Sequence, residues 1–308
     1  MKAVQIRHFG SPDDLVIGEA PAPTAPGEGQ LLVRVSAASV NPLDELTVTG
    51  RLQSLVPLDL PVTVGGDFAG IVREVGPGVD NVRVGDAVIG QAHPVLGGNG
   101  TFAEFILAPA ALTSRAPAGI DLVEAAGLPL AGTSALQALR TLEVGPQSTI
   151  VVLGAGGAAG SIGVQAAKHL GATVIADAAA DDRDYVRSLG ADEVYDYVDT
   201  SWVSRVHNVD GILDASTGVD ATVYYPMLRP AARYVSLATR HDLAAATAAG
   251  VEAISQFTYP ATDLLAEVAT LVDAGVIHQR IVAVFPAVHA RAAFAAAGIA
   301  HGKCLVTF

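Results

Sequence analysis

The sequence predicts an α/β fold built from a doubly wound parallel sheet and a separate antiparallel β-barrel domain. Two observations lead to this class. A strand, a glycine-rich turn and a helix follow one another over residues 149–171, and the chain before about residue 122 consists of strands and turns. A chain of 308 residues that is 51% hydrophobic is long enough for about two domains with buried cores. We therefore expect a barrel domain over residues 1–121, a dinucleotide-binding domain over 122–260 and a tail over 261–308 that rejoins the barrel.

The barrel domain is predicted from short segments in which apolar and polar residues alternate between Gly, Pro and Asp. Alternation with a period of two buries one face of each strand. The expected strands are 2–6, 15–20, 30–40, 70–76 and 85–90.

The second domain is predicted from helices that alternate with apolar strands, because this order produces a parallel sheet with helices on both faces. A helix over 124–139 precedes strands expected at 149–153, 172–176, 190–197, 209–214 and 232–238. In the tail we expect a helix over 263–275, a strand over 280–285, an alanine-rich helix and a final strand over 303–308.

The glycine-rich turn follows a run of apolar residues, Ile150 to Leu153, and opens a helix. Glycine lets the backbone turn tightly and approach a pyrophosphate, which is held by free N–H groups and the positive end of the helix dipole. A second apolar strand completes a βαβ unit, which favours a dinucleotide site over a glycine turn without a ligand. The residues expected to hold the cofactor are Gly154, Gly156, Gly157, Ala158, Ala159 and Gly160.

Charge and composition exclude several classes of partner. A total of 18 basic and 31 acidic residues gives a net charge of −13, which repels nucleic acid and anionic lipid. Residues 1–10 lack the basic end and apolar stretch of a signal peptide, so a cytoplasmic location is expected. The single cysteine, Cys304, excludes an intrachain disulfide, and the eight histidines show no metal-binding spacing. We expect a small-molecule substrate and no bound metal.

Seven segments carry a family resemblance, and they come in the family's order. They are MKAVQIRHFG (1–10), VNPLD (40–44), VGGDFAGIVREVGPGV (64–79), VGDAVIG (84–90), LPLAGTSALQAL (128–139), GAGGAAG (154–160) and LGADEVYDY (189–197). Through them the chain resembles the zinc-independent, zeta-crystallin-like quinone oxidoreductases of the medium-chain dehydrogenase/reductase superfamily. The resemblance implies a GroES-like (chaperonin-10-like) catalytic barrel, a Rossmann domain, a nicotinamide cofactor in the cleft and, usually, a homodimer.

The residues that hold zinc in the superfamily's alcohol dehydrogenases are missing from this sequence. The resemblance places Asn41 at the cysteine ligand and Gly66 at the histidine ligand, and the four-cysteine lobe is absent. A catalytic zinc needs three protein ligands. We therefore expect hydride transfer from a reduced nicotinamide to a substrate that is already electrophilic, such as a quinone or a conjugated enone.

The same resemblance implies three catalytic residues. Asn41 is placed beside the nicotinamide and the substrate carbonyl, although it could simply be a turn residue before Pro42. Thr133 is placed near the nicotinamide carboxamide, with a helix N-cap as the alternative. Asp44 is expected to hold structure or a proton route. The glycine-rich loop Gln91–Asn99 predicts a mobile lid or a flexible surface connection.

Further residues are expected at the cofactor. Ser216 and Gly218 follow a strand and should lie beside the nicotinamide ribose. Lys303 matches a family lysine near the cofactor, with a surface charge as the alternative.

The choice between NADPH and NADH depends on conflicting signals after the second Rossmann strand. Asp177 lies roughly where an acid binds the ribose hydroxyls of NAD, whereas Arg183 and Tyr197 resemble the residues that bind the 2′-phosphate of NADP. We expect NADPH, with NADH possible, because Arg183 matches the phosphate charge and Asp177 could turn outward. The alternative is an Arg183 that pairs with Asp181 or Asp182.

The sequence thus predicts a zinc-independent NAD(P)H-dependent oxidoreductase that acts on quinones or conjugated carbonyls. An enone or alkenal double-bond reductase is the nearest alternative. A second alternative is a nucleotide-binding sensor or structural protein without turnover. It is supported by Leu46, which stands where relatives often carry a tyrosine over the nicotinamide.

Overall fold

The computed structural model describes residues 1–238, 241–259 and 261–308, which form two compact units. Unit 1 contains residues 1–133, 261–275 and 279–308, and unit 2 contains residues 134–238, 241–259 and 276–278. Residues 122–133 therefore belong to unit 1, although the sequence assigned them to the second domain. The reason is packing, since helix α2 (Leu122–Ala125) lies on strands of unit 1 and the Leu130 amide donates to Asp67.

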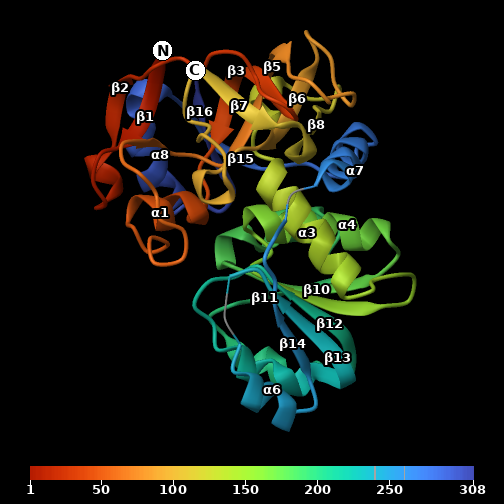
Figure 1. The fold of residues 1–308 in the computed structure, drawn as a ribbon. Helices are drawn as coiled ribbons and strands as arrows, with labels where there is room; N and C mark the ends of the chain where they lie inside the picture. Colours follow the sequence, from red (N-terminus) through yellow and green to blue (C-terminus); the bar gives the residue numbers. More distant parts are fainter. Residues whose placement is uncertain (239–240, 260) are drawn as a thin grey trace. The chain divides into compact units, whose positions relative to one another are not determined.

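The described part of unit 1 is built on two sheets (Figure 1). The larger has the order β15-β16-β3-β5-β6-β8, with β7 paired to β3, and the smaller has the order β2-β1-β4. The strands are β1 (Lys2–Ile6), β2 (Val16–Glu19), β3 (Gln30–Ser39), β4 (Val62–Thr63), β5 (Asp67–Val75), β6 (Ala87–Gln91), β7 (Phe105–Pro109), β8 (Thr113–Arg115), β15 (Ile281–Pro286) and β16 (Lys303–Thr307). Besides α2, the helices are α1 (Pro42–Val48), α7 (Thr262–Asp273) and α8 (Ala290–Ala297).

The strand pairs described in unit 1 are antiparallel, as expected, with one exception. Strands β15 and β16 are parallel, because helix α8 lies between them in the chain and carries it back to the same end of the sheet. Along β3, the alternate residues Leu31, Val33 and Val35 are buried with Phe68 and Ile106, which is the pattern that a period of two predicts.

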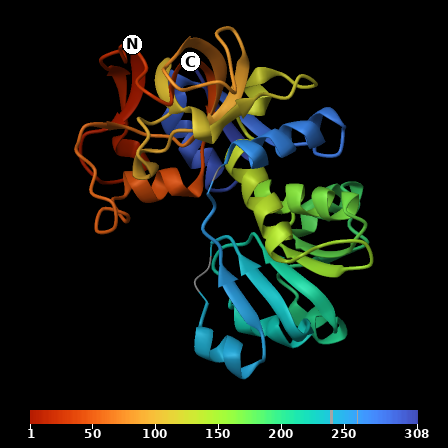
Figure 2. The same cartoon turned by 45° about the vertical axis from the view of Figure 1, so that its right-hand side comes forward.

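Within its described residues, unit 2 contains one sheet of six parallel strands in the order β11-β10-β9-β12-β13-β14 (Figure 2). The strands are β9 (Thr149–Leu153), β10 (Thr173–Ala178), β11 (Glu193–Asp196), β12 (Val209–Asp214), β13 (Leu228–Ser236) and β14 (Glu252–Ser255). The helices are α4 (Ala158–His169), α5 (Arg183–Ser188) and α6 (Leu243–Ala248), and α3 (Pro129–Thr141) begins in unit 1 and ends in unit 2. The doubly wound sheet is confirmed. Its sixth strand, β14, was not expected, because a short strand of exposed and partly exposed residues gives a weak pattern.

Both faces of this sheet are covered. Val151 and Leu153 of β9 pack with Trp202 and Tyr234 on one face, whereas Val152 faces helix α4 on the other. Strand order reverses between β9 and β12, so the loops that follow these two strands lie side by side. Ligands of open α/β sheets bind at such a point.

The remaining helical segments of the described chain are short. They are the 3₁₀ helices Pro12–Asp14, Pro94–Leu96, Ala110–Leu112, Ala180–Asp182, Thr200–Arg205, Ala221–Val223, Tyr225–Met227 and Ala287–His289. Among the described residues, no helix has both the length and the apolar character needed to cross a membrane.

Candidate functional site

The glycine turn of unit 2 requires glycine at two positions. Gly154 has a φ of +70°, and a Cβ atom there would lie 2.9 Å from the Ser216 nitrogen. A Cβ atom on Gly160 would lie 2.3 Å from the Gly154 carbonyl oxygen. Gly157, the N-cap of α4, has more room, with its nearest neighbour at 3.3 Å.

The turn presents the amino end of α4 to a ligand. Gly157, Ala158 and Ala159 are partly exposed, and N–H groups in the first turn of a helix have no acceptor within the helix. Lys168 and His169 lie in the last turn, at the negative end of the dipole. These features suit a bound pyrophosphate.

Asp177 turns inward, so the expectation that it turns outward is wrong. It is only 2% exposed, and its Oδ1 accepts a hydrogen bond of 2.6 Å from the Gly154 amide. Burial raises the pKa of Asp177 to about 7, and the negative charges of Asp214 and Asp196 act in the same direction. A carboxylate buried at the glycine turn is not available to the adenosine ribose in the way the sequence suggested.

Arg183 and Tyr197 lie after the ends of two neighbouring strands, β10 and β11. Arg183 begins α5 and is partly exposed, and its Nε donates to the Ala180 carbonyl oxygen at 3.4 Å. That bond goes to the backbone rather than to the carboxylate of Asp181 or Asp182. Tyr197 is 54% exposed. A guanidinium and a phenol are therefore both accessible to solvent at this edge.

The loop after β12 is tied to the same turn. Asp214 is fully buried, and its Oδ1 accepts hydrogen bonds from the amide of Ser216 at 2.9 Å and from its hydroxyl at 2.5 Å. The other oxygen accepts a bond of 3.0 Å from the Tyr234 hydroxyl. Gly218 follows with a φ of +77°. Ser216 is thereby held against Gly154, at the switch point of the sheet.

Unit 1 brings three of the predicted residues into one buried cluster. Asn41 is the N-cap of α1, and its Nδ2 donates to Asp67 Oδ2 at 3.0 Å. Lys303 Nζ donates to Asn41 Oδ1 at 2.5 Å and to Ser39 Oγ at 3.2 Å. Asp44 Oδ2 accepts a hydrogen bond of 2.7 Å from the backbone N–H of Asn41. Lys303 is 3% exposed, so it is not a surface charge.

Asp67 is the centre of this cluster. Its carboxylate is fully buried and accepts hydrogen bonds from Ser39 Oγ at 3.0 Å, Gln91 Nε2 at 2.6 Å and the Leu130 amide at 3.1 Å. Lys303 Nζ lies 3.5 Å away. Asp67 therefore fixes the first turn of α3 and balances the ammonium charge.

A second buried pair supports Asp44. His93 Nε2 lies 3.2 Å from Asp44 Oδ1, and His93 Nδ1 accepts a bond of 3.2 Å from the Val95 amide. An acceptor at Nδ1 places the proton of a neutral imidazole on Nε2. Nε2 and Asp44 Oδ1 are close enough for an ion pair, but neither atom makes a hydrogen bond among the described residues. Gln91 and His93 are buried, so the first part of the loop 91–99 is not a mobile lid.

Thr133 lies inside α3 and is not its N-cap. Its hydroxyl donates to the Pro129 carbonyl oxygen at 2.6 Å, one helical turn earlier, and the residue is fully buried. The structure thus shows a local role for Thr133, with its hydroxyl turned to its own helix.

Both halves of the chain match known protein families. Residues 27–118 match the family model described as alcohol dehydrogenase GroES-like domain, and residues 158–259 match the one described as zinc-binding dehydrogenase. The chain is 34% identical over 239 residues to a chloroplast envelope quinone oxidoreductase homolog of Arabidopsis thaliana, covering 74% of this chain and 72% of the relative. The chain belongs to the quinone oxidoreductase family of the medium-chain dehydrogenase/reductase superfamily.

This member of the quinone oxidoreductase family is similar to two further oxidoreductases. An NADPH-dependent alkenal/one oxidoreductase of Arabidopsis thaliana is 33% identical over 72% of this chain and 59% of the relative. The solved quinone oxidoreductase of Coxiella burnetii superposes with a TM-score of 0.90 at 28% identity, over 100% of this chain and 99% of that one. The protein is therefore an oxidoreductase, and its family indicates a nicotinamide cofactor.

The zinc positions of the superfamily hold a different set of groups in this family member. A Cβ atom on Gly66 would lie 2.8 Å from His93 Cδ2, so the His93 ring occupies the room that a side chain at position 66 would need. Asn41 uses its amide nitrogen and oxygen on Asp67 and Lys303. Among the described residues, no group of three or more His, Cys, Asp or Glu side chains is arranged to hold a metal ion.

Sequence reasoning missed four residues of this cluster, Ser39, Asp67, Gln91 and His93. Asp67 could have been found, since a carboxylate within the apolar segment VGGDFAG requires partners if it is buried. Gln91 and His93 carried no such signal, because they lie in or beside a segment that has the composition of a glycine-rich loop.

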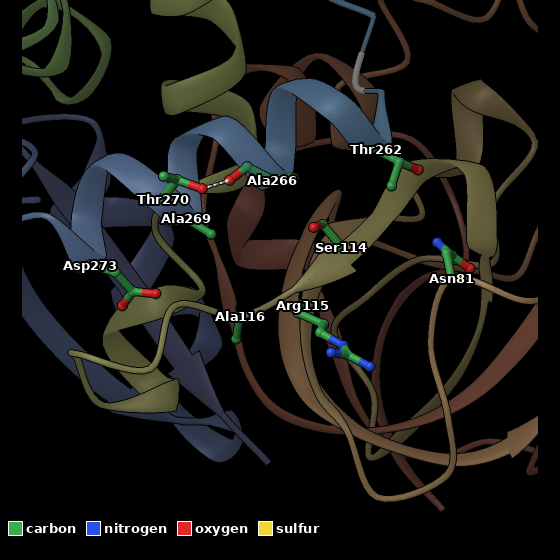
Figure 3. Close-up of a pocket in the computed structure, with 9 residues that line it drawn as sticks. All are labelled: Asn81, Ser114, Arg115, Ala116, Thr262, Ala266, Ala269, Thr270 and Asp273. Atoms are coloured by element: carbon green, nitrogen blue, oxygen red, sulfur yellow. Dashed lines mark hydrogen bonds between the residues drawn. The ribbon is translucent and has the colours of Figure 1, made fainter.

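Unit 1 also contains a groove, whose lining residues are shown in Figure 3. It measures about 540 Å³ and lies between α7 and β8. Five of its polar side chains bond within the protein, those of Asn81, Arg115, Thr262, Thr270 and Asp273. Asp273 Oδ1, for example, accepts from the Gly119 amide at 2.8 Å. None of the predicted site residues lines the groove, so it is not part of the candidate site.

Proposed function

We propose that this protein reduces quinones or conjugated carbonyl compounds with hydride from NADPH, without zinc. The observation that carries the proposal is the closed cluster of Asn41, Asp67 and Lys303. Both ends of the Asn41 amide are occupied, and the Lys303 ammonium lies where it would repel a metal cation. A donor set of this kind does not fit a catalytic zinc.

The substrate class follows from this donor set, which offers no Lewis acid. The nicotinamide, when bound, supplies the hydride. Without a metal to polarise it, the acceptor must be electrophilic by itself, as quinones, enones and alkenals are. One relative is a quinone oxidoreductase homolog and another an alkenal/one oxidoreductase, which supports this class and keeps the double-bond reductase as the second candidate.

On the substrate side, Asn41 remains the proposed catalytic residue, with Asp44 and Thr133 as proposed positioning residues, since the Thr133 hydroxyl donates to its own helix. Asp44 holds the backbone of Asn41, and Lys303 holds its side chain. Because Asp67 balances the Lys303 charge, we propose that Lys303 acts on the substrate through Asn41, whose Oδ1 it holds. The required proton comes from solvent.

On the cofactor side, the glycine turn with Gly154, Gly156, Gly157, Ala158, Ala159 and Gly160 is proposed to hold the pyrophosphate. Ser216 and Gly218 are proposed to lie beside the nicotinamide ribose. NADPH is favoured over NADH because Arg183 and Tyr197 are accessible to solvent while Asp177 is buried. A homodimer and a cytoplasmic location remain predictions.

The proposal is tested by NADPH and NADH oxidation with a panel of quinones, enones, alkenals and simple alcohols, with and without a chelator. We expect turnover with quinones or enones, unchanged by chelation, and no stoichiometric zinc in metal analysis. Alcohol oxidation that is lost on chelation would show a zinc enzyme. Tight cofactor binding without turnover on any acceptor would support the sensor alternative.

A further inference from the structure

Two buried carboxylates flank the glycine turn of unit 2. Asp177, at the end of β10, accepts a hydrogen bond from the Gly154 amide at 2.6 Å. Asp214, at the end of β12, binds Ser216, whose nitrogen would lie 2.9 Å from a Cβ atom on Gly154. Both acids are nearly inaccessible, at 2% and 0% exposure.

Within the described parts of the chain, the charged groups that act on Asp177 have the same sign as its own carboxylate. They are Asp214 on β12 and Asp196 on β11. A third acid, Asp182, lies at the same turn, where its Oδ2 would be 2.9 Å from a Cβ atom on Gly156. These acids offer Asp177 no compensating charge, and its hydrogen-bond donor is a neutral backbone amide.

Two phenols complete the surroundings of the buried acids. Burial and then the charges of Asp177 and Asp214 raise the pKa of Tyr224 to about 12. The Tyr234 hydroxyl donates to Asp214 at 3.0 Å, and its pKa is also raised, mainly by burial. Both phenols are therefore neutral near pH 7, and neither balances the carboxylate charge.

A dinucleotide at this turn would add a doubly charged pyrophosphate to the same region. Charges of like sign repel, and the repulsion is screened little in a buried site. The interaction disappears if Asp177 carries a proton. Burial already holds the pKa of Asp177 at about 7, so the proton is available near neutral pH.

We propose that Asp177 is a cofactor-binding residue that takes up a proton when the dinucleotide binds. The proposal rests on the proposed function in one respect, that the glycine turn binds a dinucleotide. It assigns to Asp177 a role different from a ribose contact: the neutral acid removes the repulsion beneath the pyrophosphate.

The sign of the pH dependence follows from linkage. The bound nucleotide favours the protonated acid, so it raises the pKa of Asp177 above its value of about 7 in the free protein. Affinity is then highest below about pH 7 and falls as the pH rises. For each unit by which binding raises the pKa of Asp177, the affinity can differ by at most about tenfold between low and high pH.

The test measures the dissociation constant of NADH, which lacks the titrating 2′-phosphate, at about pH 6 and about pH 8.5. For a one-unit increase in pKa, the wild-type affinity should fall about five- to tenfold between these values. Asp177→Asn keeps an oxygen that can accept the Gly154 amide and should show no such fall. The matched control is Asp181→Asn, which removes an exposed acid nearby and should keep the wild-type pH dependence.

A second measurement uses the wild-type protein alone. Calorimetric titration with NADH near pH 7.5, in two buffers of different ionisation enthalpy, should show uptake of about half a proton. A pH-independent affinity with no proton uptake would overturn this inference while leaving the proposed function intact. An unchanged pH dependence in a folded Asp177→Asn variant would also overturn it. Absence of binding of both NADH and NADPH at both pH values would overturn both proposals.

Discussion

Replacing Lys303 with Met should destabilise the protein strongly, because it leaves a buried carboxylate without its cation. Lys303 Nζ lies 3.5 Å from Asp67 Oδ2, and the two side chains are 4% and 0% exposed. At an effective dielectric constant of about 20, their attraction is about 5 kcal/mol. Asp67 keeps neutral donors from Ser39, Gln91 and Leu130, so we expect a loss near the lower end of the range of about 3 to 5 kcal/mol for a broken buried pair.

The assay is urea unfolding followed by circular dichroism. The matched control is Lys168→Met, whose ammonium lies only 2.8 Å from Asp192 Oδ2 but whose pair of side chains is 30% and 42% exposed. Solvent screening should keep its cost below about 1 kcal/mol. The double variant with Asp67→Asn should recover part of the loss, since the unpaired charge is then absent. A Lys303→Met cost no larger than that of Lys168→Met would refute the reasoning.

Three further predictions concern unit 2. Arg183→Ala should weaken NADPH binding roughly 10- to 150-fold and leave NADH nearly unchanged, because a charge-assisted bond contributes about 1.5 to 3 kcal/mol; equal shifts in the two dissociation constants would remove Arg183 from the phosphate site. Gly160→Ala should impair cofactor binding far more than Gly157→Ala, since its Cβ atom would lie 2.3 Å from a carbonyl oxygen rather than 3.3 Å, and calorimetric titration of both variants decides this. Asp177→Asn should raise the free energy of unfolding by roughly 2 to 4 kcal/mol above pH 7, because the folded protein raises the pKa from 3.8 to about 7, and the gain should vanish below about pH 4. A gain that does not change with pH would contradict the buried titration.

Much of the fold follows from local patterns. Period-two alternation in β3 and the apolar run of β9 identify strands without reference to the rest of the chain. The glycine turn is equally local, because φ at Gly154 and the packing at Gly160 depend on neighbouring backbone. The end of the first unit was placed too early, since residues 122–133 resemble the helices of unit 2 and their attachment depends on distant partners.

Part of the candidate site could also be predicted from local patterns, and part could not. The motif positions of Asn41, Lys303 and Arg183 could be read from the sequence, together with the absence of zinc ligands at positions 41 and 66. Their surroundings could not be read in this way. Asp67 and His93 join the cluster through contacts with residues that lie 24 to 236 positions away, which no local pattern encodes.

The sequence by itself determined the fold class, the glycine turn and the family, because these depend on residue type and spacing along the chain. The tertiary structure alone decided which polar groups are buried and what they face. Asp177 illustrates the difference: its position favoured a ribose contact, but the fold turns it toward Gly154 and excludes water. The free energy of a charged group depends on burial and on charges from other strands, so its role is settled only when those strands come together.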